Sequence, residues 1–280
     1  MFGFFRRPKP EPVRQSGLFL THVTSPRIQN HFDRLVEQTR GLVDWHLVVN
    51  EGNLPNPRVD LPVAPAADVL PTRCRQMLEN GGIQNGFADT LFIPCVLASP
   101  APYVWVLEYD VDFSGDWSRL FRQFQNTPSD LLTTTVCLKG ETPEWFHWRR
   151  TGAPPGVDSL HFYRAFMPIF RISQRLALAY GEATEDGGWE GHYEFTIPTV
   201  AHAAGFSVED IVAGRPRSFR WARYQNYENH PGNDWLRPGT MVWRPSRPNY
   251  FFEAPNEFRK RNMLYHPIKT DNSDWNGSGE

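Results

Sequence analysis

The start of the chain constrains the fold more than any other stretch, because it predicts a strand, a helix and a second strand in succession. Residues 18–23 form an apolar run typical of a buried strand. Ser25 then suits a helix N-cap, with Pro26 at the first helical position, and Gly41 ends the helical pattern. Residues 42–49 are typical of a second strand. Such a β-α-β unit implies parallel strands joined by a right-handed crossover, so we expect an α/β fold.

Three later stretches extend this expectation. Residues 91–107 carry no charge but are interrupted by prolines, so they predict two buried strand segments and not a membrane span. Residues 162–180 show an apolar stripe at helical spacing and predict a long helix, with a kink at Pro168 as an option. Residues 192–204 predict another helix, which Gly205 ends. Strands and helices are therefore expected along most of the chain.

The domain organisation is predicted to be simple. The chain has 280 residues, enough for one large α/β domain, and we see no internal repeat and no obvious linker. We expect a flexible lead over residues 1–16, a single domain over residues 17–269 and a disordered tail over residues 270–280.

Composition and charge exclude some classes of function. The formal net charge is −2, which argues against a general nucleic-acid binder. The 3 cysteines are widely spaced and fit neither a zinc pattern nor a disulfide framework, as expected in a reducing compartment. The N-terminus lacks the order and length of a signal peptide, so we expect a cytoplasmic protein. Phe2, Phe4 and Phe5, beside basic residues, leave peripheral contact with the inner face of the membrane as an alternative to a disordered tail.

Three carboxylates follow the apolar run of residues 104–107 at alternate positions: Glu108, Asp110 and Asp112. Successive side chains of a strand point to opposite faces, so we expect these three to line one side of the chain where a buried strand emerges. Like charges at that spacing need water or a cation to compensate them. A solvated strand end is the alternative interpretation, because an Asp-x-Asp pattern by itself is common.

These acids predict a metal site. Hard oxygen ligands at a strand end suit Mg²⁺ or Mn²⁺, which typically takes one or two carboxylates together with substrate phosphates. The turn over residues 24–27 has none of the glycines of a dinucleotide fingerprint or a phosphate loop, so a nucleotide would have to be held in another way. A metal ion bound by Asp110 and Asp112 would hold the phosphates of the nucleotide instead. The pattern indicates a site that handles a nucleotide diphosphate.

A second candidate site lies where a glycine-flanked loop opens into the helix predicted from residue 192. Glu190 and Glu194 are four residues apart and share a face if this helix begins early. A carboxylate near a helix N-terminus, in a segment that can move, is suited to act as a general base for an acceptor hydroxyl. Acids that only complement the helix dipole are the alternative.

A third candidate lies near the C-terminus, where His266 precedes a proline and is thereby fixed in an extended stretch. An imidazole there could complete a metal site made of carboxylates, and the nearby Lys269 could neutralise a phosphate. A histidine with a structural role is the alternative.

Three segments together resemble the nucleotide-sugar glycosyltransferases of the GT-A fold, and among them a group marked by an E-Y-D-V-x-F-x-G-D-W segment. They read E-Y-D-V-D-F-S-G-D-W over residues 108–117, G-H-Y-E-F-T-I-P-T over residues 191–199 and L-Y-H-P over residues 264–267. Their order matches, and with the β-α-β unit they cover most of the chain. The resemblance implies a Rossmann-like mixed sheet flanked by helices, with residues 17–269 as one GT-A-like catalytic domain.

The resemblance also implies roles for the acidic residues. Asp110 and Asp112 would hold Mn²⁺ or Mg²⁺ on the donor diphosphate as an Asp-x-Asp motif, and either of the two could be the more important. His266 would take the position of a C-terminal metal-binding histidine. Glu194 would be the base of an inverting transfer, with Glu190 as its substitute in another register.

The remaining site residues are assigned to the two substrates. We assign Glu108 and Lys269 to binding of the nucleotide-sugar donor. Trp145 and Trp148 lie in an aromatic loop and would be platforms for a glycan acceptor, with burial of the two rings as the alternative.

The sequence therefore predicts a metal-dependent glycosyltransferase that moves a sugar from a nucleotide-diphosphate donor to a glycan or other hydroxyl acceptor. Two alternatives remain. A metal-dependent phosphoesterase could use the same acids, although it usually needs further His and Asp clusters for a second metal. A carbohydrate-binding or nucleotide-binding protein that has the fold without turnover is the other.

Overall fold

The structure of the protein is a computed structural model that describes residues 15–214, 224–228, 239–241 and 260–268. The basic and aromatic N-terminus and the predicted tail lie outside these residues, so the structure does not bear on either of them. The first strand already begins at Gln15, inside the stretch that was predicted to be a flexible lead.

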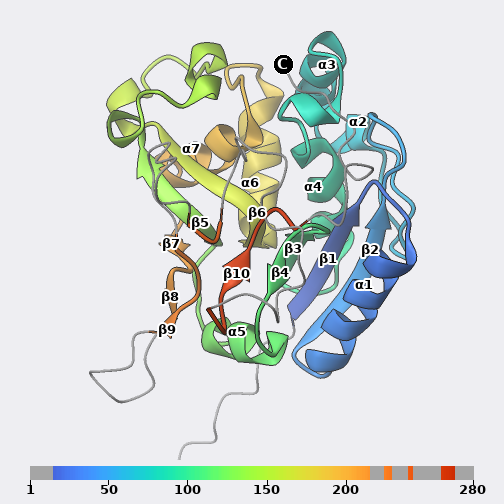
Figure 1. The fold of residues 1–280 in the computed structure, drawn as a ribbon. Helices are drawn as coiled ribbons and strands as arrows, with labels where there is room; N and C mark the ends of the chain where they lie inside the picture. Colours follow the sequence, from blue (N-terminus) through green and yellow to red (C-terminus); the bar gives the residue numbers. More distant parts are fainter. Residues whose placement is uncertain (1–14, 215–223, 229–238, 242–259, 269–280) are drawn as a thin grey trace, which may run out of the picture.

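Within the described residues, six strands form one mixed sheet in the order β2-β1-β3-β6-β5-β7 (Figure 1). Strand β1 pairs in parallel with β2 and β3, and β6 runs antiparallel to its neighbours β3 and β5. The strands are β1 (Gln15–Thr21), β2 (Val43–Val49), β3 (Tyr103–Glu108), β5 (Leu131–Leu138), β6 (Tyr163–Ser173) and β7 (Val208–Asp210). The expected α/β class, with a mixed sheet flanked by helices, is confirmed.

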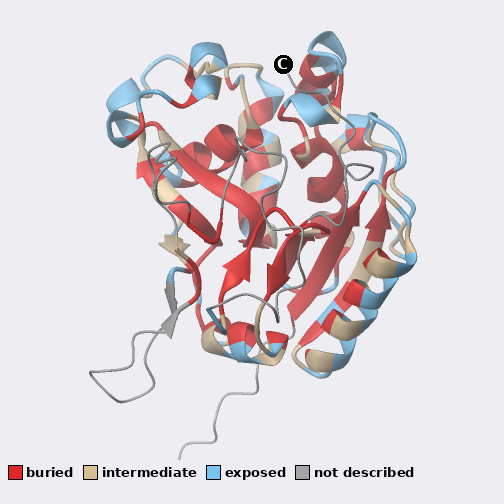
Figure 2. Ribbon diagram, viewed as in Figure 1, coloured by how far each residue is buried: buried red, intermediate tan, exposed pale blue. Residues whose placement is uncertain are grey.

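Helices cover both faces of this sheet, and Figure 2 shows the strands buried between them. Leu18 and Leu20 pack into one apolar core with α4, α6 and α7, whereas Phe19 packs into a second core with α1 and α5. This alternation follows from the two-residue period of a strand. The helices are α1 (Pro26–Gln38), α2 (Ala66–Val69), α3 (Pro71–Glu79), α4 (Asp89–Ala98), α5 (Trp117–Phe124), α6 (Gln174–Glu185) and α7 (Tyr193–Ala203).

Shorter elements complete the fold. Strand β4 (Asp112–Phe113) pairs with β10 (Leu264–Tyr265), and β8 (Ala213–Gly214) pairs with β9 (Tyr224–Gln225). Single 3-10 turns lie between the main elements: η1 (Ile83–Asn85), η2 (Lys139–Glu141), η3 (Phe146–Arg150) and η4 (Ser159–His161).

The predicted β-α-β unit is confirmed, with Ser25 capping α1 through a hydrogen bond from the Ile28 N–H. The helix predicted from residue 192 is also present as α7, and Gly205 follows it with a φ of +75°.

Two other predictions were wrong in element type. The first half of residues 91–107 belongs to helix α4 and not to a strand, because a helix that is buried on all sides shows no polar face. Residues 162–180 are not one helix but strand β6 followed by α6, which Ser173 caps by accepting from the Leu176 N–H. Strand β6 is buried on both faces, so it lacks the alternation that would mark it in the sequence.

No helix among the described residues combines the length and the apolar character that crossing a membrane requires.

Candidate functional site

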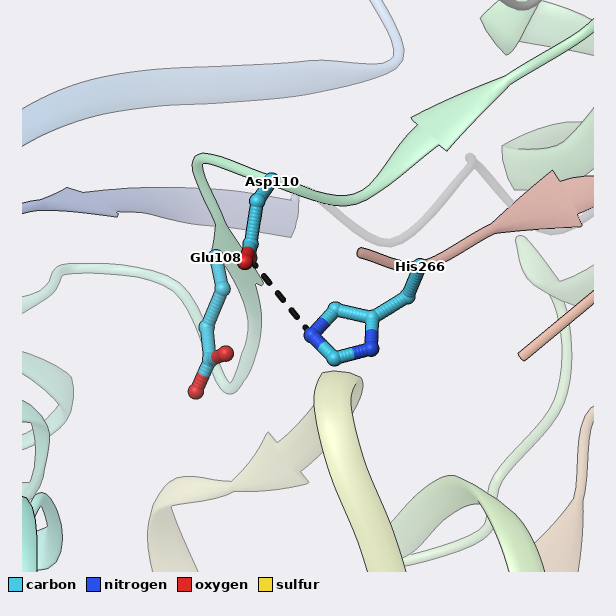
Figure 3. A group of neighbouring side chains, drawn as sticks. All are labelled: Glu108, Asp110 and His266. Atoms are coloured by element: carbon cyan, nitrogen blue, oxygen red, sulfur yellow. Dashed lines mark ion pairs between the residues drawn. The ribbon is translucent and has the colours of Figure 1, made fainter. Parts of the chain in front are cut away.

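Glu108, Asp110 and His266 come together beyond the end of β3 (Figure 3). Each offers a ligand atom, and these atoms all lie within 4.8 Å of one another. His266 Nε2 lies 3.6 Å from Asp110 Oδ1, and both side chains are buried. Two carboxylates and an imidazole at these separations can hold a divalent cation.

The pairing of β4 with β10 brings this group together. Leu264 pairs with Phe113 and Tyr265 with Asp112, so that His266 follows directly beside the acidic segment. The Ile268 N–H donates to the Asp110 carbonyl at 2.8 Å and holds the two segments together beyond the paired residues. The phenyl ring of Phe166 lies edge-on to the His266 imidazole, with ring centroids 5.1 Å apart. These contacts fix the orientation of the histidine.

Asp112 lies outside this group, so the expectation that three acids line one side of a strand was wrong. Strand β3 ends at Glu108, and the Val111 N–H turns back to the Glu108 carbonyl at 3.0 Å. The Asp112 carboxylate is bound instead by the Arg34 guanidinium and accepts from the Phe113 N–H at 2.6 Å. An acid already paired with a guanidinium has its charge compensated within the protein.

A cavity of about 1090 Å³ adjoins the cluster. Glu108 and His266 line it, together with both glutamates of the second predicted site, Glu190 and Glu194. The structure thus unites three segments that are far apart in the sequence. The other lining residues come from α3, η1, η3, β6 and the turns beside them: Gln76, Glu79, Asn80, Gln84, Asn85, Phe87, Phe146, His147, Arg149, Arg150, Phe166 and Pro168, with Gly191, His192 and Tyr193 beside the glutamates.

Glu194 is a buried carboxyl group in the first turn of α7. His192 caps this helix by accepting from the Glu194 N–H at 3.2 Å, and the Met167 N–H of β6 donates to Glu194 Oε1 at 2.9 Å. Burial raises the pKa of Glu194 to about 7, although the Met167 hydrogen bond and the Arg164 charge act in the opposite direction. A carboxyl group with this pKa can take up and release a proton near neutral pH.

Glu190 lies outside the helix, because α7 begins only at Tyr193. Its backbone pairs with Gly152 in an isolated bridge, with N···O distances of 3.0 and 3.1 Å, and its side chain is exposed. The two glutamates therefore do not share a helix face, although both reach the same cavity.

Tyr193 connects the two parts of the site. Its hydroxyl donates to Glu108 Oε1 at 3.4 Å, while the next residue is Glu194. Burial and the neighbouring Glu108 charge raise the pKa of the Tyr193 phenol, so it stays a donor at neutral pH. Tyr193 was not predicted from the sequence, since a single tyrosine beside a glutamate carries no signal of its own.

Trp145 and Trp148 are not platforms at the cavity wall, which corrects their assignment to acceptor binding. Both are buried in the core that includes Phe195. The Trp148 Nε1–H donates to the Thr142 carbonyl at 2.7 Å, and the Arg164 guanidinium covers the Trp145 ring at 5.4 Å. The neighbouring Phe146 lines the cavity instead. Lys269, the predicted phosphate-binding residue, lies outside the described residues.

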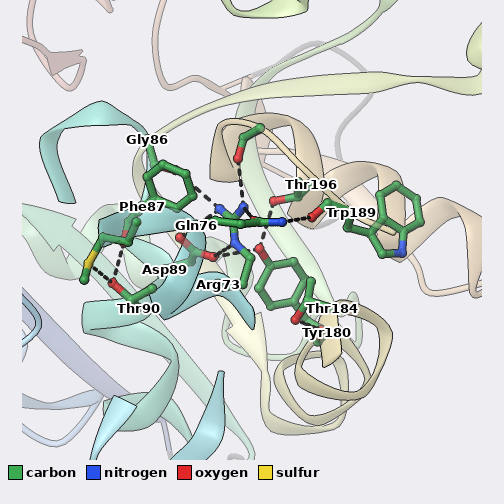
Figure 4. A network of polar contacts seen from close by, with 12 residues as sticks. Arg73, Gln76, Gly86, Phe87, Asp89, Thr90, Tyr180, Thr184, Trp189 and Thr196 are labelled. Carbon is green, nitrogen blue, oxygen red and sulfur yellow. Dashed lines mark hydrogen bonds and ion pairs between the residues drawn. The ribbon is translucent and has the colours of Figure 1, made fainter. Parts of the chain in front are cut away.

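A buried network of polar side chains holds the segment that carries the two glutamates (Figure 4). Arg73 forms a bidentate ion pair with Asp89, at 2.6 and 3.2 Å, and both side chains are fully buried. Arg73 also donates to the Gly191 carbonyl at 3.0 Å, and Gln76 donates to the Trp189 carbonyl at 3.0 Å. These contacts flank Glu190 on both sides.

The same network continues into α7. The Tyr180 hydroxyl donates to Asp89 Oδ2 at 2.7 Å and lies 2.8 Å from Thr196 Oγ1. Thr196 is two residues beyond Glu194. Helices α3, α4 and α6 thus fix the position of the candidate base. This network could not be predicted from the sequence, because its members are far apart in the chain.

Comparison by sequence finds no matching protein-family model and no similar curated protein. By structure, the chain is similar to a protein assigned as a glucose-1-phosphate thymidylyltransferase from Bacillus anthracis, solved with a sucrose, at 12% identity and a TM-score of 0.36 over 70% of this chain and 85% of that one. It is also similar to the inositol-1-phosphate CTP transferase from T. maritima, at 13% identity and a TM-score of 0.34 over 71% and 86%. Similarity at these scores says nothing about the activity of this chain.

Proposed function

We propose that the protein is a metal-dependent glycosyltransferase with a GT-A-like catalytic domain, which moves a sugar from a nucleotide-diphosphate donor to a hydroxyl acceptor with inversion. The observation that carries the proposal is a shared cavity. A buried carboxyl group with a pKa of about 7, Glu194, lines the same cavity as Glu108 and His266 of the acid–histidine cluster. A proton acceptor and a cation site on one cavity are what such a transfer requires.

Glu108, Asp110 and His266 would hold the cation. The two carboxylates suit either Mg²⁺ or Mn²⁺, and the imidazole favours Mn²⁺, because nitrogen ligands suit transition metals better than Mg²⁺. A bound Mn²⁺ would supply compensation for the negative charge that develops on the leaving nucleoside diphosphate. In this proposal Glu108 is a metal ligand, and it reaches the donor through the cation. Tyr193 orients it by donating to its Oε1 atom.

Glu194 would take the proton from the acceptor hydroxyl. The Met167 N–H holds Oε1, and His192 Nδ1 lies 3.8 Å from Oε2. The raised pKa makes the carboxylate a stronger base than an exposed glutamate while leaving a large fraction ionised near neutral pH. Glu190 is the second candidate for the base. Its side chain is exposed, so the position of its carboxylate is less firmly fixed.

The acid–histidine cluster and Glu194 distinguish the proposed transferase from two alternative functions. A phosphoesterase with two metals would need a second group of ligands, and the described residues contain one group of this kind. A binding protein without turnover would use the cluster but would not depend on Glu194. The test must therefore measure binding and turnover separately.

The test begins with thermal unfolding of the full chain in the presence of UDP, GDP or CMP, each with and without Mn²⁺. A ligand at about a hundred times its Kd adds about 2.7 kcal/mol of stability. We expect one nucleotide to stabilise the protein only with Mn²⁺, and Asp110→Asn to remove that effect. Asp112→Asn is the matched control, because Asp112 is two residues away but lies outside the cluster.

Turnover is then measured with the sugar donors of that nucleotide. Glu194→Gln should bind nucleotide and Mn²⁺ like the wild type and lose roughly a hundredfold or more in sugar transfer or donor hydrolysis. Full activity of Glu194→Gln would exclude the role assigned to this residue. No response of the wild type to any nucleotide would exclude the donor class.

A further inference from the structure

Two arginines of the cavity wall have no role in the transfer described above. Arg149 and Arg150 are exposed, lie in η3 and line the cavity. Within the described part of the chain, neither guanidinium forms an ion pair with a carboxylate. Arg149 instead lies 5.8 Å from the ring centroid of Phe146, itself 51% exposed. Two consecutive arginines on a cavity wall can supply guanidinium groups that bind an anion.

The arginine segment is packed against the segment that carries the candidate base. Gly152 and Glu190 exchange two backbone hydrogen bonds. Gly191 has a φ of +117°, and a Cβ atom at this position would lie 2.7 Å from the Arg150 carbonyl oxygen. Only glycine allows this close approach. The arginines are thereby tied to the part of the site where the acceptor hydroxyl would meet Glu194.

Polar side chains at the end of α3 and in η1 line the same cavity and are suited to a ligand with many hydroxyl groups. They are three amides and a carboxylate, which can donate to and accept from hydroxyls. They belong to Glu79, Asn80, Gln84 and Asn85, whereas the amide of the neighbouring Gln76 is already engaged by Arg73 and by the Trp189 carbonyl.

We propose that the acceptor carries a phosphate group, which Arg149 and Arg150 bind while the hydroxyl-rich part of the acceptor reaches Glu194. The proposal rests on the proposed function and names the acceptor class of that site. Two adjacent positive charges match a phosphate monoester, which carries close to two negative charges at neutral pH, better than they match a single carboxylate. The phosphate could belong to a soluble sugar phosphate or to the headgroup of a lipid.

The experiment compares the wild type with Arg149→Gln/Arg150→Gln and with a control of equal charge change, Arg40→Gln/Arg75→Gln. Arg40 and Arg75 are exposed and do not line the cavity. Four probes are titrated: hexyl phosphate, glucose 6-phosphate, hexanoate, and phosphatidylcholine vesicles with or without phosphatidic acid. Mn²⁺-dependent nucleotide binding is measured in parallel on each variant.

We expect the wild type and the control to bind a phosphate monoester, and the Arg149→Gln/Arg150→Gln variant to bind it at least roughly tenfold more weakly. Binding of glucose 6-phosphate without vesicle binding supports a soluble acceptor. Binding of hexyl phosphate and of vesicles only when they contain phosphatidic acid supports a lipid-borne acceptor.

Three results would overturn the proposal. The first is that the arginine variant and the wild type bind the phosphate monoester with equal affinity. The second is that hexanoate binds with the same affinity as hexyl phosphate. The third is that the arginine variant loses Mn²⁺-dependent nucleotide binding. The last would assign the arginines to the donor diphosphate. If the wild type binds a phosphate monoester through the arginines but no nucleotide, the anion site stands and the proposed transferase function fails.

Discussion

Two groups of buried or half-buried charged residues lie close to the cavity, and they differ in what their polar atoms contact. In the network around Arg73 and Asp89, the polar atoms contact one another and nearby backbone carbonyls, and neither of the two charged residues lines the cavity. In the cluster at the end of β3, Glu108 and His266 line the cavity, and the possible ligand atoms of the cluster lie within 4.8 Å of one another. The first arrangement fixes the shape of the site, and the second leaves its donor atoms available to a ligand.

This difference distinguishes buried charges with a structural role from charges placed to bind a ligand. A carboxylate that forms a bidentate pair with an arginine inside the protein has its desolvation compensated, and removing its partner is costly. Carboxylates that converge with an imidazole on a cavity are placed for an ion or a substrate. Three predictions test this comparison.

The largest effect is expected at the network. Arg73→Met leaves the Asp89 carboxylate buried without its partner, so we expect the free energy of unfolding to fall by about 3–5 kcal/mol. Urea denaturation measures it. The double variant Arg73→Met/Asp89→Asn removes both charges and should recover part of the loss. A loss below about 1 kcal/mol in Arg73→Met, the size typical of an exposed pair, would contradict the structural role of the network.

The next effect concerns Glu194 and depends on pH. Its pKa in the folded protein is about 7, above the ordinary value of 4.5. The stability contributed by the protonated, buried carboxyl group is therefore fully present below pH 4.5 and is lost as the pH rises to 7. Glu194→Gln does not titrate, so it should gain stability relative to the wild type over this range, by up to about 3 kcal/mol.

Thermal unfolding of both proteins at a series of pH values checks this expectation. The matched control is Glu190→Gln, because Glu190 is an exposed residue of the same cavity wall, and its stability should follow that of the wild type. Parallel pH curves for Glu194→Gln and the wild type would mean that the pKa of Glu194 is not raised.

The smallest effect is expected at Asp112. Asp112→Asn removes the ion pair with Arg34, a partly exposed side chain, so the cost should be about 1 kcal/mol or less. Mn²⁺ affinity, measured by titration of the ion alone, should stay unchanged. A large loss of Mn²⁺ affinity would show that Asp112 is a ligand of the cluster and that its pairing with Arg34 does not keep it apart from the metal.

The sequence predicted well those parts of the fold that depend on local signals. The cap at Ser25 and the proline that begins α1 are local signals, and so is Gly41, which has a φ of +76° shortly after the helix ends at Gln38. Helix α4 and strand β6 were interchanged in type, because each is buried on all sides and its period is hidden. The identity of such an element is decided by its packing and not by its own sequence.

The candidate site was predictable in residue type more than in arrangement. Glu108, Asp110 and His266 were singled out as separate signals, and their meeting depends on the pairing of β4 with β10. The turn after Glu108, closed by the hydrogen bond from the Val111 N–H to the Glu108 carbonyl, separates Asp112 from Asp110 and was not predicted from the alternating acids. Arg73 and Asp89 carry no pattern at all, because their importance arises only from burial together.

The pairing of β4 with β10 also has a thermodynamic consequence. Asp110 and His266 are far apart in the sequence and meet only while residues 264–265 are docked on β4. An ion held by both residues would therefore strengthen the docking by as much free energy as the docking contributes to the affinity for the ion, since linkage is reciprocal. A change such as Leu264→Ala, in the apolar contact of β10 and not itself a ligand, would then weaken cation binding without altering the ligands themselves.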